Sequence, residues 1–277
     1  MLLPGYRYKL KIQDITPKGV WLTAQEQQIF LPRSECPEEI NPEETIEVFL
    51  YLDRDNKPKV TTRMPLAQVG EFALLKVQSV GSHGAFLDWG LEKDLLAPYS
   101  EQAQKMEEGR RYLVHICHDK DSRPIASSRL EKFLVKENRD LSEGAEVDLL
   151  IWAFTDLGAK VIVNDYYEAL LYKDEIPPAL KRGEHHLGYV LRIRADHRID
   201  VTLRRPGAAG IKDAREIILQ ALKKDGFLPL HDQSPPEQIR NQLGLSKKVF
   251  KKAVGGLYKD GLVALGNQGI KLIPGER

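Results

Sequence analysis

The chain has 277 residues, a formal net charge of +1 and 42% hydrophobic residues, as expected of a globular protein. So small a net charge gives no overall basic signal for nucleic acid. The two cysteines, Cys36 and Cys117, are far apart and lack CxxC spacing, which supports neither a disulfide framework nor a thiolate zinc site.

Apolar runs in the chain are short. Nowhere do 18 uninterrupted apolar residues occur, and the opening MLLPGYRYKL has no long apolar core, so we expect no membrane association and a cytoplasmic location. The charge is unevenly distributed. From Ile211 onward there are 12 Lys and Arg against 7 Asp and Glu, which leaves 29 against 33 before it. The C-terminal part is therefore basic and the rest slightly acidic.

Three segments of the chain resemble one another at a spacing of 65 to 75 residues. They begin GYRYKLKI at Gly5, GEFALLKV at Gly70 and GAEVDLLI at Gly144. Further on, FLPRSE matches LAPYSE and LLYKDE, and KPKVTTR matches RPIASSR and RIDVTLR. Self-similarity at a regular spacing predicts three copies of one module.

Each copy has the pattern of five short strands separated by turns rich in Gly, Pro and Asp. In the first copy the strands are GYRYKLKI, GVWLTA, IFLP, TIEVFLYLD and KPKVTTR. Five short strands, with a glycine opening the second, favour a small closed barrel of the OB type over a sandwich, which needs more strands. We therefore predict OB barrels over residues 1–64, 65–133 and, with a linker, 134–205.

The second strand of the first two copies carries an aromatic residue on its solvent side. In GSHGAFLDWG, Ala85 and Leu87 share one strand face, and Phe86 lies on the other. Trp21 holds the same place in the first copy. An unpaired base stacks on such a ring for about 1–3 kcal/mol with little sequence preference. The alternative is that loops or a neighbouring copy cover the rings, because single exposed aromatics are common.

The second copy resembles the S1 RNA-binding motif, an OB fold, in the segments VGSHGAFLDWG, LLAPYSE and the basic-ended strand IASSR. In that family two second-strand positions and one third-strand position face the nucleic acid. The resemblance implies such contacts at His83, Phe86 and Pro98 in the second copy and at Lys18, Trp21 and Pro32 in the first. The third copy offers Leu157, Lys160 and Tyr172, which depart from the pattern, so a structural role is the alternative there.

Basic residues recur at matching strand positions of the copies. Lys11 and Lys76 lie on first strands, and Arg63, Arg129 and Arg204 end last strands. Such side chains neutralise phosphates, although exposed charges are also often merely solvated. We predict RNA contacts for four of them: Lys11, Lys76, Arg63 and Arg129.

After the third copy the pattern changes from strands to helices. RRPGAAG predicts a flexible joint, followed by a domain over residues 211–277. KDAREIILQALKKDG predicts a helix closed by Gly226. SPPEQIRNQLG predicts a second helix, with Ser234 as its cap, Glu237 completing a capping box and Gly244 at its end.

LSKKVFKKAVGGLYKDG predicts a third helix capped by Ser246, and LVAL and GIKLI around GNQG predict a hairpin. Two helices joined by a short turn and followed by a hairpin are typical of a winged helix. The third helix divides into an apolar and a lysine-rich face at 100° per residue. This helix meets nucleic acid in helix-turn-helix proteins, so we predict contacts from Lys247, Lys248, Lys251, Lys252, Tyr258 and Lys259.

Two features limit that prediction. A lysine face on a surface helix commonly serves solubility alone. The face also offers no Arg, Asn or Gln for bidentate base contacts, so we expect phosphate attraction without strong sequence choice.

Three S1-like repeats followed by a winged helix, with SKKVFKKAVGGLYKDGLV in the last unit, resemble the conserved virulence factor B family of bacterial RNA-binding regulators. The resemblance covers essentially the whole chain. It implies a regulatory role in the expression of other genes.

Signals for catalysis and metal binding are weak. His115 and Cys117 of HICHD share a strand face, but a zinc site needs three or four converging ligands, which favours ordinary strand residues. His185 and His186 have no nearby partner set, and GxxxxGK[ST] is absent. We predict no catalytic residue, no metal site and no cofactor.

The sequence therefore predicts a non-catalytic protein that binds single-stranded RNA in post-transcriptional control. One alternative is a transcription regulator whose winged helix binds duplex DNA. Another is a scaffold for ribosome-associated proteins, which the slightly acidic barrel region favours because it steers RNA weakly. The oligomeric state, the base preference and the target transcript stay open.

Overall fold

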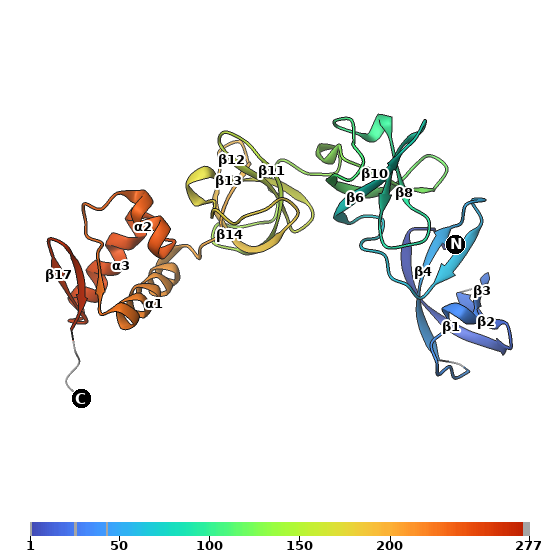
Figure 1. The fold of residues 1–277 in the computed structure, drawn as a ribbon, viewed down its shortest axis with the longest axis horizontal. Coiled ribbons are helices and arrows are strands. Elements are labelled where there is room, and N and C mark those ends of the chain that lie inside the picture. Colours follow the sequence, from blue (N-terminus) through green and yellow to red (C-terminus); the bar gives the residue numbers. More distant parts are fainter. Residues whose placement is uncertain (1, 25–26, 43, 274–277) are drawn as a thin grey trace. The chain divides into compact units, whose positions relative to one another are not determined.

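The computed structural model describes residues 2–24, 27–42 and 44–273. Three mainly β modules are followed by a module with three helices and a small sheet (Figure 1). The predicted fold class is confirmed. Between Leu134 and Val135 the chain divides into two compact units, the first with two β modules and the second with the third β module and the helices. The domain limits within these units stay predictions.

The first barrel consists of five strands in the order β3-β2-β1-β4-β5. They are β1 (Tyr6–Thr16), β2 (Gly19–Ala24), β3 (Gln27–Pro32), β4 (Thr45–Leu52) and β5 (Pro58–Thr61). The second barrel repeats this order with β6 (Phe72–Val80), β7 (Gly84–Asp88), β8 (Leu95–Pro98), β9 (Arg111–His118) and β10 (Pro124–Ser127). The third comprises β11 (Glu146–Phe154), β12 (Gly158–Val163), β13 (Tyr167–Tyr172), β14 (His185–Ile193) and β15 (Ile199–Thr202).

Among the described strands, only the third barrel is closed by a backbone ladder, which pairs β13 with β15 in parallel. In the first two barrels, side chains join the turn after the third strand to the end of the fifth. Thr61 Oγ1 donates to Glu35 at 2.6 Å, and Ser127 Oγ donates to Glu101 at 2.7 Å. Thr202 bonds to Glu175 in the same way in the third barrel. This repeated contact explains why the copies share a Glu after the third strand and a hydroxyl at the end of the fifth.

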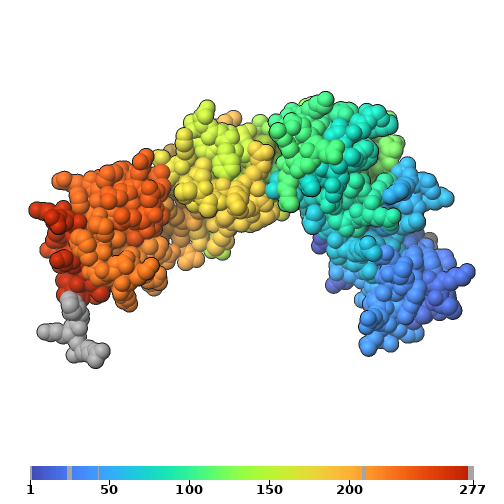
Figure 2. All heavy atoms as spheres, viewed as in Figure 1, coloured from blue at the N-terminus to red at the C-terminus, as the bar shows by residue number. Residues whose placement is uncertain are grey.

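The cores follow the predicted alternation. Val20 and Leu22 are completely buried in the first barrel, as are Ala85 and Leu87 in the second. The first two barrels also share apolar contacts, because the ring of Phe49 meets Trp89 edge-on with centroids 5.5 Å apart. Figure 2 shows the blue first barrel in contact with the cyan to green second barrel. These two barrels therefore form one unit.

The C-terminal module is a winged helix. Its elements are α1 (Gly207–Asp225), β16 (Phe227–Leu228), α2 (Pro236–Leu243), α3 (Lys247–Lys259), β17 (Val263–Gly266) and β18 (Gly269–Leu272). Gly226 and Gly244 end α1 and α2 in the left-handed conformation, as predicted. The Ser246 side chain caps α3 by accepting a hydrogen bond from the Val249 amide at 3.4 Å.

Two local predictions for this module were wrong. The GAAG segment is not a flexible joint but the first turn of α1, which begins at Gly207 directly after Pro206. Alanine favours helix, and a proline at the start loses no helical hydrogen bond. Ser234 does not cap α2, because its Oγ accepts from the His231 amide at 2.9 Å. Pro235 and Pro236 lack the N–H groups that a capping hydroxyl could otherwise bind.

Candidate nucleic-acid interface

The first barrel presents a pair of rings rather than one. Trp21 lies on the outer face of β2, where its side chain is 39% exposed. Pairing of β2 with β3 places Phe30 directly opposite, and the two ring centroids are 5.1 Å apart. Phe30 was missed from the sequence, although its place in IFLP becomes clear once the strand register is known. The two rings provide a wider stacking surface than Trp21 alone.

Lysines flank the rings on the same outer face. Lys11 is exposed on β1 and pairs across the strands with Thr23, two residues along β2 from Trp21. Lys76 in the second barrel is exposed and pairs with Asp88, two residues from Phe86. Because strand side chains alternate between faces, these lysines lie on the ring side of their sheets.

The remaining predicted residues of the first two barrels lie in turns. Lys18 and His83 are exposed before β2 and β7, and the His83 ring lies 3.0 Å from Ser82 Oγ. Arg63 is exposed and lies 3.9 Å from the Glu35 carboxylate, beside the turn that follows Pro32. Arg129 is exposed after β10. The arginines are thus beside the turns rather than beside the rings.

In the second barrel, Phe86 is half-buried on the outer face of β7, opposite Leu96 of β8. It lines a cavity of about 310 Å³ together with His83 and Pro98. The three positions taken from the S1 resemblance therefore come together around one hollow. A volume near 300 Å³ is at the lower end for small-molecule sites.

The third helix of the winged helix has the predicted faces. Its apolar side chains are buried at Phe250, Ala253, Val254 and Leu257. The opposite face exposes Lys248, Lys251, Lys252, Tyr258 and Lys259, and Lys247 is half-buried. Lys251 is engaged within the domain, since its Nζ lies 3.2 Å from the Asp232 carboxylate. The other four exposed side chains make no ion pair within the described residues.

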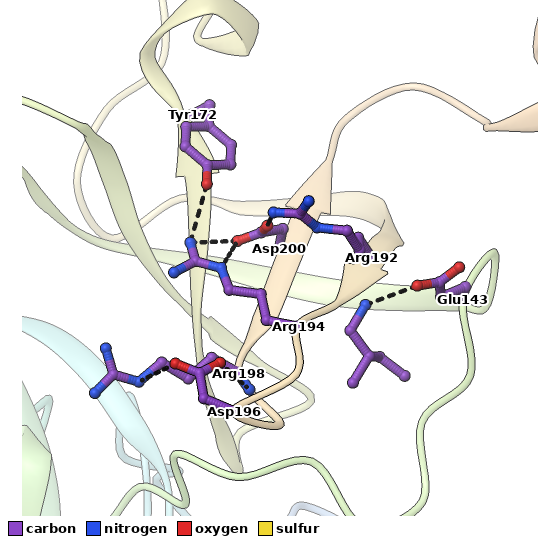
Figure 3. Close-up of polar contacts among 8 residues, drawn as sticks. Glu143, Tyr172, Arg192, Arg194, Asp196, Arg198 and Asp200 are labelled. Carbon is purple, nitrogen blue, oxygen red and sulfur yellow. Dashed lines mark hydrogen bonds and ion pairs between the residues drawn. The ribbon is translucent and has the colours of Figure 1, made fainter.

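The third barrel carries a basic cluster that the sequence analysis missed (Figure 3). Asp200, only 1% exposed, binds two arginines of β14 and the following turn. Arg194 Nε donates to it at 2.8 Å, and Arg192 donates at 3.0 Å. Arg194 also donates to the Tyr172 hydroxyl at 3.1 Å. The sequence signal for this basic cluster was the run LRIRADHRIDV, which has no counterpart in FLYLD or HICHD, the equivalent segments of the other copies.

The predicted positions of the third copy adjoin this cluster. Leu157 is 68% exposed, and Lys160 lies over the Trp152 ring at 4.7 Å from its centroid. Leu157, Lys160, Tyr172 and Arg194 line one hollow of about 680 Å³. The copy that departs most from the S1 pattern therefore also presents aromatic and basic groups together.

His115 and Cys117 are packed as strand residues. The His115 ring stacks on Phe133 at 4.0 Å and contacts Phe72 at 4.7 Å between centroids. Burial lowers the pKa of His115 and raises the pKa of Cys117 to about 11. Within the described ranges no three His, Cys, Asp or Glu side chains gather as metal ligands would. None of the helices described there is long and apolar enough to span a membrane.

Family models match most of the modules described above. A model described as an S1 domain matches residues 4–63 and 69–129, and one described as a CvfB-like winged helix domain matches residues 216–272. The first two barrels and the winged helix are thus accounted for. The third barrel lies outside the matched ranges.

Relatives extend the likeness along the chain. YitL of Bacillus subtilis (strain 168) is 28% identical over 272 residues, covering 94% of this chain and 90% of that protein. Conserved virulence factor B of Staphylococcus epidermidis (strain ATCC 12228) is 24% identical over 254 residues, covering 86% and 83%. A crystal structure of a multidomain protein with nucleic acid binding domains from Streptococcus pneumoniae is 21% identical, covering 96% and 97%, with a TM-score of 0.40.

The fold and the matched models define a protein assembled from S1 and winged-helix domains, modules of nucleic-acid binding, and they indicate no enzyme family. The resemblance to the conserved virulence factor B family is confirmed, and it extends over most of the chain.

Proposed function

We propose that this protein binds single-stranded RNA without catalysis and acts in the cytoplasm in post-transcriptional control of gene expression. The observation that carries the proposal is the equivalent placement of Trp21 and Phe86, each on the outer face of the second strand of its barrel. Both belong to ranges matched by an S1 domain.

The geometry favours unpaired bases. Trp21 with Phe30 offers a ring pair, and Phe86 lines a hollow large enough for a base. Stacking on such rings requires bases that have left the duplex, which is why RNA recognition of this kind targets single strands. Lys11 and Lys76 lie beside the rings, where they are placed to meet the backbone phosphates.

The C-terminal unit supplies further contacts to the backbone. The exposed lysines of α3 are point charges suited to phosphates rather than to base edges. In the third barrel, Asp200 fixes the direction of Arg192 and Arg194, so their guanidinium groups are oriented before a ligand arrives. Several weak sites on one chain raise the overall affinity by effective concentration.

The test is a direct comparison of ligands. A labelled single-stranded 12-mer RNA, the same sequence as duplex RNA and the same sequence as duplex DNA are titrated at two salt concentrations. We expect the single-stranded RNA to bind tightest at both. Tighter binding of duplex DNA would instead identify a transcription regulator led by the winged helix. Binding to none of the three at low salt, with a stable protein complex recovered from ribosomes, would identify a scaffold.

A further inference from the structure

The hollow beside Phe86 belongs to both of the first two barrels. The second barrel contributes Phe86, Leu96 and Pro98, and the first barrel contributes Leu52 at the end of β4 and Asn56 in the turn before β5. A single OB barrel would leave this side of the ring open. Here the neighbouring barrel provides a further wall, and the cavity measures about 310 Å³.

Lys93 fixes that wall in place. Its ammonium donates to the Asp53 carbonyl at 2.7 Å and to Asn56 Oδ1 at 3.4 Å, both on the turn of the first barrel. Its own carbonyl accepts from the Trp89 indole at 2.7 Å. Burial lowers the pKa of Lys93, which agrees with a side chain withdrawn from water. The cavity is therefore a preformed feature of the two-barrel unit.

One acid on the cavity wall, Asp94, has no partner among the described residues. Phe86 pairs with Leu96 and Leu87 with Leu95. The same alternation, continued to the residue before β8, puts Asp94 on the same outer face as Phe86, in agreement with its place in the cavity lining. The Asp94 carboxylate makes no hydrogen bond or ion pair with any described residue. Burial, followed by the nearby charge of Asp88, raises its pKa.

The neighbouring acid shows what a satisfied carboxylate looks like at this site. Asp88 accepts from Gln78 Nε2 at 3.2 Å and from the Gly90 amide at 3.0 Å. Asp94, the residue just before β8, lines the hollow and has no such donor among the described residues. The Asp94 carboxylate is half-buried, and a ligand that brings donors gives it hydrogen bonds that the described residues do not supply.

A carboxylate beside a stacking ring discriminates between bases. It repels phosphate but accepts hydrogen bonds from a base edge. Guanine presents two adjacent donors, N1–H and the N2 amino group, which match the two oxygens of a carboxylate. Adenine and cytosine present one amino group next to an acceptor, and the single N–H of uracil lies between two carbonyl oxygens. Guanine is therefore the base that such an acceptor prefers.

We propose that the cavity between Phe86 and Asp94 is a guanine-selective base pocket, in which the base stacks on Phe86 and directs its Watson–Crick edge to Asp94. The proposal rests on the proposed binding of single-stranded RNA and adds a base preference to it. The lysine face of α3 offers ammonium donors instead of a carboxylate acceptor and binds without this preference.

The experiment uses the full chain and a series of RNA nonamers in which four uridines flank each side of one variable base. We expect the nonamer with guanine to bind about tenfold tighter than those with uracil or adenine, which corresponds to about 1.4 kcal/mol. The nonamer with inosine, which lacks the N2 amino group, should fall between them. This comparison uses the wild-type chain, so it does not depend on how a variant folds.

Asp94→Asn supplies the second comparison, with Glu108→Gln as control, an exposed acid of the same barrel outside the cavity lining. Asp94→Asn should remove the guanine preference while the uracil nonamer binds at least as well as before, and Glu108→Gln should keep the preference. Equal binding of all nonamers by the wild type would overturn the pocket and leave RNA binding intact. Binding of no nonamer would instead refute the proposed function itself.

Discussion

Replacing Lys248, Lys252 and Lys259 together by Gln should make RNA binding less dependent on salt. These lysines of α3 are exposed and make no ion pair within the described residues, whereas Lys251 is held by Asp232. Each phosphate contact to a single strand contributes about 0.7 to the slope of log affinity against log salt concentration. Loss of three contacts therefore reduces the slope by about 2.

The assay is fluorescence anisotropy of a labelled single-stranded RNA at salt concentrations from about 50 to about 200 mM. Across this fourfold range, a slope difference of about 2 means that the wild type loses about 16-fold more affinity than the variant. A loss of active protein lowers the apparent log affinity equally at every salt concentration and leaves the slope unchanged, so a change in slope reports lost phosphate contacts.

The control has the same change in charge within the same domain. Lys212, Lys223 and Lys224 are exposed on α1, and their replacement by Gln should leave the slope within about 0.5 of the wild-type value. If the two triple variants lower the slope equally, α3 acts only through the overall charge of the domain, and the reasoning about its face is refuted.

Three further predictions concern stability. Gly84 has a φ of +153°, and a Cβ there would lie 2.1 Å from the Ala97 carbonyl, so Gly84→Ala should lower the free energy of unfolding of the first unit by about 3 kcal/mol, measured in urea. Gly109→Ala, with a φ of +80° and open space, should cost only about 1 kcal/mol, and equal costs would contradict the predicted clash. Asp200→Asn should destabilise the third barrel by about 1–3 kcal/mol, because two arginines lose their buried charged partner. The loss should be seen as faster amide hydrogen exchange in β14 and β15, and unchanged exchange would contradict this prediction. The pKa of Cys117 is raised to about 11 in the folded chain, so the thiol of the unfolded chain loses its proton at lower pH, and the free energy of unfolding should decline between about pH 9 and 11. Cys117→Ala should show a smaller decline over this range, and identical pH profiles would show that this thiol is not the cause.

The repeated modules could be predicted from the sequence because their signals are local. Alternation with a period of two placed Val20 and Leu22 inside and Trp21 outside, and the structure bears this out. The glycines that open the second strands made it possible to align the three copies with one another. Gly84, for example, faces the Ala97 carbonyl so closely that no side chain fits there.

The features that could not be predicted from the sequence depend on contacts between residues far apart in the chain. Nothing near Phe30 in the sequence shows that it lies opposite Trp21, because strand register is set by the whole sheet. Likewise, Asp200 becomes a buried partner of Arg192 and Arg194 only when the hairpin of β14 and β15 forms. The flexible joint expected at GAAG was wrong because helix propensity and Pro206 outweighed the glycines.

The most direct test of the account is the affinity for single-stranded RNA of two double variants. Trp21→Leu with Phe86→Leu keeps apolar side chains but removes both ring faces, and Trp21→Phe with Phe86→Tyr keeps the rings. We predict that the leucine pair weakens binding by at least about 30-fold, the loss expected of two stacked bases at about 1 kcal/mol each, while the aromatic pair stays within about threefold of the wild type. Wild-type affinity in the leucine pair would contradict the account.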